Sequence, residues 1–195
     1  MEITNINQLD LNSTYSYADY LLWKLKERVE LFRGKILKMS PAPSRKHQEI
    51  SFNLTLTIGH LFRNSPCKLY IAPFDVRLPK TPQNRADQEV FTVVQPDLCI
   101  VCDENKLDDK GCIGAPDLII EILSPGNSKK EMKSKFEIYE EAGVREYWIV
   151  DPVYESVLIN VLENGVYRTF RPIVDDEVKS HIFPNIVLHT QNIFF

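Results

Sequence analysis

The chain has 195 residues, of which 44% are hydrophobic and 26% charged, and its formal net charge is −4 at pH 7. This composition is ordinary for a globular protein with a substantial core, so we expect one domain over residues 1–195 and exclude a disordered or fibrous chain. The net negative charge argues against a protein that coats nucleic acid, so any contact with nucleic acid would be local.

The first predicted elements are a helix and a β-hairpin. Residues Ser16 to Lys26 read as a helix, because the serine is a favoured N-cap and an aspartate follows in the first turn. The strand-like residues from Val29 to Met39 are interrupted by Arg33-Gly34, which predicts a hairpin that turns there.

A second helix, a strand and a polar loop are predicted next. The run 41–44 contains two prolines and should end the hairpin, with Ser44 as the N-cap of the helix. Lys68 to Leu78 is predicted as a strand and Pro79 to Thr92 as a loop. The apolar residues of the helix recur with a helical period at Ile50, Leu54, Ile58, Leu61 and Phe62.

Two strand-like runs follow, each with an acidic residue in its middle. This residue is Asp97 in the run from Val93 to Val101, and Glu121 in the almost wholly apolar run from Ala115 to Pro125. An ionised carboxylate in a strand covered on both faces is costly unless a cation pairs with it. Either a metal ion binds both acids or each acid pairs with a buried arginine or lysine, and for the two acids together we favour the metal.

The alternation of side chains along a strand indicates where these acids point. Asp97 shares a face with Gln95, and Glu121 shares a face with Asp117. If the two strands are neighbours, Asp97 and Glu121 converge, and the carbonyl oxygen of Ile122 adds a further ligand. Two carboxylates with water are the usual ligands of Mg²⁺. Capping or a salt bridge explains Asp117 equally well.

The four cysteines, Cys67, Cys99, Cys102 and Cys112, do not complete a zinc motif. Cys99 and Cys102 have CxxC spacing, but no second CxxC or HxxxH accompanies them. Cys99 lies within a strand pattern, which favours packing in the core. We therefore expect reduced thiols and no structural zinc.

The C-terminal half is predicted to contain one helix and several strands. Ser128 to Ala142 reads as a helix that ends at Gly143, and Arg145 to Asp151 as a strand, so the helix is a candidate crossover connection. Asn164-Gly165 is a strong hairpin signal, and residues 178–195 are β-like. The order of elements predicts the α/β class, with helices packed on a mixed β-sheet and a hairpin region toward each end of the chain.

The helix after Ser128 begins with lysines at the end where the helix dipole disfavours cations, namely Lys129, Lys130, Lys133 and Lys135. A bound anion such as phosphate would offset the repulsion between these lysines and the helix dipole, although a solvent-exposed helix face explains the first three lysines better. Lys135 shares a helical face with Glu131 and Tyr139, and its apolar neighbours indicate a face turned toward the sheet.

A set of motifs extends along most of the chain. In chain order they are Val29-Glu30-Leu31-x2-Gly34, Ser40-Pro41 followed by His47, Gln95-Pro96-Asp97, Gly114-Ala115-Pro116-Asp117-Leu118-Ile119-Ile120-Glu121-Ile122-Leu123-Ser124-Pro125, and Lys135-x3-Tyr139-x3-Gly143-Val144-Arg145-Glu146-Tyr147-Trp148-Ile149-Val150-Asp151-Pro152. These long, ordered motifs resemble the Uma-two family of restriction-endonuclease-like proteins, over roughly Tyr15 to Asp176.

The resemblance implies the PD-(D/E)xK nuclease fold, a restriction-endonuclease-like core in which a mixed sheet flanked by helices carries a metal site on two central strands. Asp97 would be the first acid of the motif and Glu121 the second. The lysine expected two residues later falls at Leu123, which cannot serve, and the family pattern offers Lys135 instead. This displacement is compatible with activity, because the chemistry needs a positive charge at a point in space.

We therefore expect hydrolysis of phosphodiester bonds in nucleic acid, most readily DNA, with Mg²⁺ or Mn²⁺ held by Asp97 and Glu121. Lys135 would orient the attacking water or stabilise the transition state. The resemblance adds two residues that would not stand out by position: Glu30 would bind a second metal or orient water, and His47 would contact phosphate or transfer a proton. Gln95 would fix the nucleophile.

The competing interpretation is a catalytically inactive protein on the same fold that binds nucleic acid or a regulatory partner. The missing ExK spacing and the acidic charge favour it. Strong sequence specificity would need a homodimer or another partner, and the hairpin at Asn164-Gly165 and residues 192–195 are candidate surfaces for self-association. Because no long apolar run or signal-peptide pattern occurs, we expect a cytoplasmic protein without a membrane partner.

Overall fold

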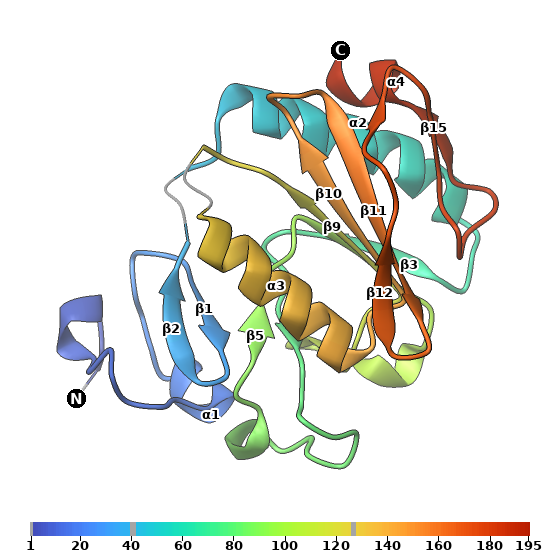
Figure 1. The fold of residues 1–195 in the computed structure, drawn as a ribbon. Helices are drawn as coiled ribbons and strands as arrows, with labels where there is room; N and C mark the ends of the chain where they lie inside the picture. The colour runs from blue at the N-terminus through green and yellow to red at the C-terminus, as the bar shows by residue number, and fades with distance from the viewer. Residues whose placement is uncertain (1, 40–41, 126–127) are drawn as a thin grey trace.

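The computed structural model describes residues 2–39, 42–125 and 128–195. Ser40 and Pro41, which belong to a motif and to the predicted end of the hairpin, lie outside the described residues. A seven-stranded sheet forms the centre, and two long helices, α2 (Arg45–Phe62) and α3 (Lys129–Ala142), lie against it (Figure 1).

The central sheet is mixed, as predicted. Its strands are β3 (Lys68–Ile71), β6 (Leu98–Val101), β9 (Leu118–Ile122), β10 (Glu146–Asp151), β11 (Ser156–Glu163), β12 (Val166–Thr169) and β13 (Ile173–Val174). The order is β12-β11-β10-β9-β6-β3, with β13 beside β11. β9 and β10 are parallel and joined by α3, so the predicted crossover is confirmed, while the other neighbours run antiparallel.

The two helices cover opposite faces of this sheet. Alternate residues of a strand point to alternate faces, so neighbouring residues of one strand meet different helices. Leu118 and Ile120 of β9 belong to the cluster that packs against α2, whereas Ile119 belongs to the cluster that packs against α3. Glu121 follows Ile119 on the α3 face, where it bonds to Lys135. The alternation of β9 therefore decides which helix meets the acid.

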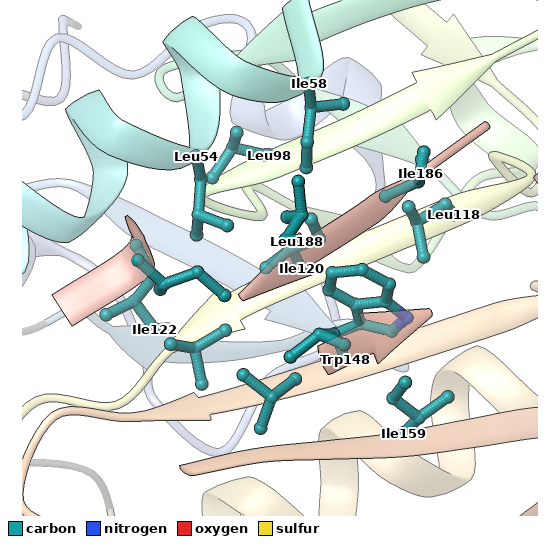
Figure 2. Packing of buried hydrophobic residues seen from close by; sticks show 14 of the residues in the cluster. Leu54, Ile58, Leu98, Leu118, Ile120, Ile122, Trp148, Ile159, Ile186 and Leu188 are labelled. Carbon is teal, nitrogen blue, oxygen red and sulfur yellow. The ribbon is translucent and has the colours of Figure 1, made fainter. Parts of the chain in front are cut away.

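The face under α2 carries the larger apolar core, shown in Figure 2. Leu54 and Ile58 of α2 lie over Ile120, and Trp148 of β10 fills the space below them. Ile186 and other residues of the C-terminal segment complete this cluster. Full burial of each such side chain contributes about 1.5–3 kcal/mol, so this core anchors the strands that carry the acids.

A second sheet of six strands packs beside α3 and the N-terminal segment (Figure 1). The predicted hairpin is confirmed, with Arg33 and Gly34 in the left-handed region at φ 49° and 80°. A Cβ atom on Gly34 would lie 2.4 Å from Cγ2 of Thr14, so glycine is needed there. In spatial order the strands are β2 (Lys35–Lys38), β1 (Val29–Phe32), β5 (Val93–Val94), β4 (Val76–Arg77), β8 (Gly111–Ile113) and β7 (Leu107–Asp108).

The first predicted helix is shorter than expected. Only α1 (Tyr17–Tyr20) is helical, with Ser16 as its N-cap, because Lys24 donates its backbone N–H to the carbonyl oxygen of Ile3 and draws the chain away. None of the described helices is long and apolar enough to cross a membrane. The other small elements are η1 (Ile6–Gln8), η2 (Asp87–Glu89), η3 (Glu104–Lys106), β14 (Glu177–Lys179), β15 (Val187–His189) and α4 (Thr190–Phe194).

Two predicted strands are each divided between the two sheets, which corrects the sequence expectation. The run 93–101 separates into β5 and β6, because Pro96 has no N–H and Gln95 donates its own to the side chain of Glu30. The run 68–78 separates into β3 and β4, with a cis peptide bond between Ala72 and Pro73. At these two interruptions the chain passes from one sheet to the other, and the two sheets meet near Asp97 and Glu121.

The cysteines also depart from the expectation of reduced thiols. Cys67 and Cys102 form a disulfide, because Lys68 lies opposite Val101 in the pairing of β3 with β6 and the cysteines are the next pair along. The predicted packing of Cys99 is confirmed, since its thiol is free and buried. The sulfur of Cys102 is bonded to Cys67, so the CxxC pair does not offer two thiolates to zinc.

Candidate active site

A cleft of about 210 Å³ lies where the two sheets, α2 and α3 meet. Its lining comes from segments that are far apart in the sequence, including β1, α2, the end of β3, the β5–β6 connection, β9 and α3. All of the residues predicted for the site line it: Glu30, His47, Gln95, Asp97, Glu121, Ile122 and Lys135. The structure therefore brings the predicted residues together in one cleft.

The two acids converge across neighbouring strands. β6 pairs antiparallel with β9, and Leu98 lies opposite Ile120, so Asp97 follows opposite Glu121. Oδ2 of Asp97 accepts the backbone N–H of Ile122 at 2.8 Å. Asp97 and Glu121 therefore converge as alternation predicts, although Asp97 is not part of β6 but directly precedes its first residue.

Lys135 reaches Glu121 from the helix on the same face. Its Nζ donates to Oε1 of Glu121 at 2.8 Å and lies 3.4 Å from Oε1 of Glu30. The hydroxyl of Tyr139, one turn later on α3, donates to the same Glu121 oxygen at 2.6 Å. Ser128 caps this helix by accepting the N–H of Glu131, which fixes where the helix begins.

Carboxylates outnumber ammonium groups around Glu121. Glu30 and Glu121 both contact the ammonium group of Lys135, and the charge of Asp97 also acts on Glu121. Burial raises the pKa of Glu121 to about 7, and Asp97 and Glu30 add to this effect against the opposing influence of Lys135. Burial lowers the pKa of Lys135, but Glu121 and Glu30 outweigh it and hold that pKa above its ordinary value. A proton or a cation would relieve the excess negative charge.

The raised pKa of Glu121 predicts that the metal-free protein loses stability as pH rises. Between the ordinary value of 4.5 and about 7 the folded state holds this proton more tightly than the unfolded state, so the free energy of unfolding falls with pH in that window. The contribution of this group should change by about 1.4 kcal/mol per pH unit. Urea denaturation in chelator from pH 5 to pH 8, for wild type and Glu121→Gln, measures it. Parallel pH profiles for the two proteins would contradict the prediction.

His47 lies in the first turns of α2 and meets Asp97 at the edge of the cleft. Its Nε2 is 3.3 Å from Oδ2 of Asp97. Burial lowers the pKa of His47, but the hydrogen bond and charge of Asp97 outweigh burial, so the pKa is raised. Nδ1 of His47 is buried and has no hydrogen-bond partner among the described residues. This imidazole is therefore protonated more readily than a free histidine.

The side-chain amide of Gln95 has no remaining hydrogen-bonding capacity. Its Oε1 accepts from Nε and Nη2 of Arg28 at 2.9 and 2.6 Å, and its Nε2 donates to Tyr20 and Asp75 at 3.1 and 2.8 Å. An amide has two donors and accepts about two hydrogen bonds, so all are in use. No motif or periodic pattern marks Arg28 or Asp75, so the sequence carried no signal for either.

The donors in the cleft suit a hard divalent cation. Within residues 2–39, 42–125 and 128–195, no group of three or more His, Cys, Asp and Glu side chains is placed to hold a metal ion. Asp97 and Glu121 each keep one carboxylate oxygen that accepts no hydrogen bond from a described residue. Two such oxygens with the carbonyl of Ile122 fit Mg²⁺, which retains several waters.

Asp117, on the same face of the chain as Glu121, has a structural role. Its Oδ2 accepts the backbone N–H of Cys102 at 2.9 Å, and its Oδ1 pairs with Arg145 at 3.0 Å. Both contacts tie the start of β9 to neighbouring segments. The salt-bridge interpretation of this residue is confirmed.

Comparison with known proteins identifies the family and supports the fold. A family model described as "Uma2: Putative restriction endonuclease" matches residues 17–191. An uncharacterized protein of Synechocystis sp. (strain ATCC 27184 / PCC 6803 / Kazusa), slr1290, is 30% identical over 127 residues, which are 64% of this chain and 61% of that relative's length. A crystal structure from Anabaena variabilis ATCC 29413, titled a "putative nuclease belonging to DUF820", has a TM-score of 0.70 and 21% identity, covering 92% of this chain and 97% of that one.

Proposed function

Since the chain belongs to the Uma2 family, we propose that it is a metal-dependent endonuclease that hydrolyses phosphodiester bonds of nucleic acid, with DNA as the substrate. The observation that carries the proposal is the convergence of Asp97, Glu121 and Lys135 in one cleft, from two neighbouring strands and the helix that connects β9 to β10. Two carboxylates can hold a divalent ion that activates water, and an ammonium group beside them can stabilise charge on the phosphate.

Asp97, Glu121 and the carbonyl of Ile122 would hold Mg²⁺ or Mn²⁺. The bound ion would lower the pKa of a water molecule and neutralise charge on the phosphate. The excess of carboxylates over ammonium groups in the cleft supports this assignment, because a divalent cation offsets the charge that otherwise raises the pKa of Glu121.

Lys135 supplies a fixed positive charge beside the acids. Its ammonium group is held between Glu121 and Glu30, and its raised pKa keeps it protonated across the physiological range. A donor that is already oriented stabilises negative charge on the phosphate without reorganisation in the transition state. Glu30 holds Lys135 from the other side, and a second metal ion at Glu30 is the alternative for this residue.

His47 is placed for proton transfer at the edge of the cleft. Asp97 raises its pKa above the ordinary value of a histidine, which favours the protonated imidazole that a general acid requires. A protonated His47 would donate to a phosphate oxygen or to the leaving group through Nε2, in exchange for its contact with Asp97, because Nδ1 is buried. The carboxylate of Asp97 orients the ring through Nε2.

One observation favours the competing function, a catalytically inactive protein that binds nucleic acid. Lys135 and Tyr139 both donate to Oε1 of Glu121, so this buried acid already has a cationic partner without a metal ion. A structural ion pair of this kind would keep its residues without catalysis. Metal binding separates the two proposals, because only the enzyme requires it.

Cleavage of nucleic acid tests the proposed function directly. Supercoiled plasmid, single-stranded DNA and RNA are incubated with the protein in Mg²⁺, in Mn²⁺ or in chelator. We expect cutting of DNA only when a divalent ion is present, because the carboxylates need it to activate water. Absence of cutting in every condition, together with absence of Mn²⁺ binding, would reject the enzyme in favour of the binding protein.

A further inference from the structure

The hydrogen-bond network around Gln95 ends at an exposed arginine on the rim of the cleft. Arg28 directly precedes β1 and lines the cleft, and its side chain is open to solvent. Nε and one N–H of Nη2 donate to Oε1 of Gln95. A guanidinium group has five N–H donors, so three remain for a ligand.

Gln95 fixes the direction of this guanidinium group. Its amide is held from the other side by Asp75 and Tyr20, and its backbone N–H donates to the buried Glu30. The paired contact through Nε and Nη2 orients the plane of Arg28, which a single hydrogen bond would not do. The exposed arginine is therefore presented at the cleft in a defined orientation.

Charge singles out Arg28 as a phosphate ligand. Three cationic side chains line the cleft, those of Arg28, His47 and Lys135. His47 pairs with Asp97, and Lys135 pairs with Glu121 and Glu30. No carboxylate of a described residue forms an ion pair with Arg28. A phosphodiester entering beside the carboxylates of the cleft meets, in Arg28, a cation that no described carboxylate compensates.

We propose that Arg28 binds a backbone phosphate of the nucleic acid, and that Gln95 acts by positioning Arg28 and not by orienting the attacking water. The inference rests on the proposed function and names the residue that holds the substrate. Planar N–H pairs match phosphate oxygens, and the three remaining donors of Arg28 provide such a pair. The saturated amide of Gln95 has no donor or acceptor left for water.

Binding of fluorescently labelled DNA oligonucleotides in chelator tests Arg28 without cleavage. Arg28→Ala should weaken binding about tenfold and reduce the salt dependence of binding by about one phosphate contact. Arg28→Lys should keep the salt dependence and recover part of the affinity. Arg33→Ala is the matched control, because Arg33 is an exposed arginine on the same hairpin whose partner is Glu141.

The role of Gln95 is tested by combining variants. Gln95→Ala should weaken binding and raise KM with little change in kcat, and it should add no further loss in the Arg28→Ala protein. Urea denaturation confirms that each variant folds. If Gln95→Ala instead lowers kcat at saturating DNA in the Arg28→Ala background, Gln95 serves the nucleophile and the positioning role is wrong.

The outcomes separate this inference from the proposed function. If wild type binds DNA without cutting it, and Arg28→Ala loses affinity, phosphate binding by Arg28 is supported and the endonuclease activity is rejected. If Arg28→Ala binds like wild type while cleavage depends on Glu121, the endonuclease activity is supported and phosphate binding by Arg28 is rejected. Failure of wild type to bind any oligonucleotide would overturn both.

Discussion

Replacing Glu121 with glutamine is expected to lower the rate of metal-dependent DNA cleavage by about 10³-fold. The amide has nearly the same shape, and its carbonyl oxygen still accepts from Lys135 and Tyr139, so the fold should be kept. It cannot supply a charged oxygen to a divalent ion. Asp97→Asn should have a similar effect, since Asp97 is the other carboxylate at the convergence of β6 and β9.

Cleavage rate and Mn²⁺ affinity should be measured together for these variants. Glu137→Gln is the matched control, because Glu137 lies on α3 near the site but pairs with Lys133 outside the cleft. Loss of both rate and Mn²⁺ binding in Glu121→Gln and Asp97→Asn, with neither lost in Glu137→Gln, is the expected pattern. Cleavage that survives in Glu121→Gln would show that the buried acid is structural.

The second large effect is on stability. Lys135→Ala should lower the free energy of unfolding by about 3–5 kcal/mol above pH 8 in chelator, because it leaves Glu121 and Glu30 buried without their cation. The loss should shrink toward pH 5, where Glu121 can take up a proton. Urea denaturation of Lys135→Ala and of Lys133→Ala, an exposed lysine on the same helix, measures the difference.

Divalent ions should partly restore the Lys135→Ala protein. A cation held by the same carboxylates replaces the missing ammonium charge, so Mg²⁺ or Mn²⁺ should stabilise this variant more than they stabilise wild type. Equal stability of Lys135→Ala and Lys133→Ala in chelator would contradict the buried ion pair. Equal stabilisation of wild type and variant by metal would contradict a shared cation site.

Short-range signals in the sequence predicted most of the fold. Ser44 and Ser128 cap α2 and α3 as expected, and Gly143 ends α3 at φ 86°. Each signal depends on residues within one turn of helix or one β-turn, so it can be read without knowing the rest of the chain. The predicted single domain, cytoplasmic location and homodimer depend on no such local feature and stay predictions.

The candidate site was predicted only in part, and the family resemblance supplied two of its members. Alternation along two apolar runs predicted that Asp97 and Glu121 converge if the strands are neighbours, which they are, and helical spacing turned Lys135 toward the sheet. Glu30 and His47 had no positional signal and entered through the motifs of the family.

The sequence by itself determined most of the helices and strands and which face of its strand each acid shares; the pairing of β6 with β9 made the acids converge. Only the tertiary structure decided that the run 93–101 crosses between sheets, that Cys67 meets Cys102, and that Gln95 is saturated by Arg28, Asp75 and Tyr20. The physical reason is that the hydrogen bonds in which a side chain takes part, and the net charge around it, depend on every group that surrounds it. Most of these groups come from segments tens of residues away, so no local pattern contains them.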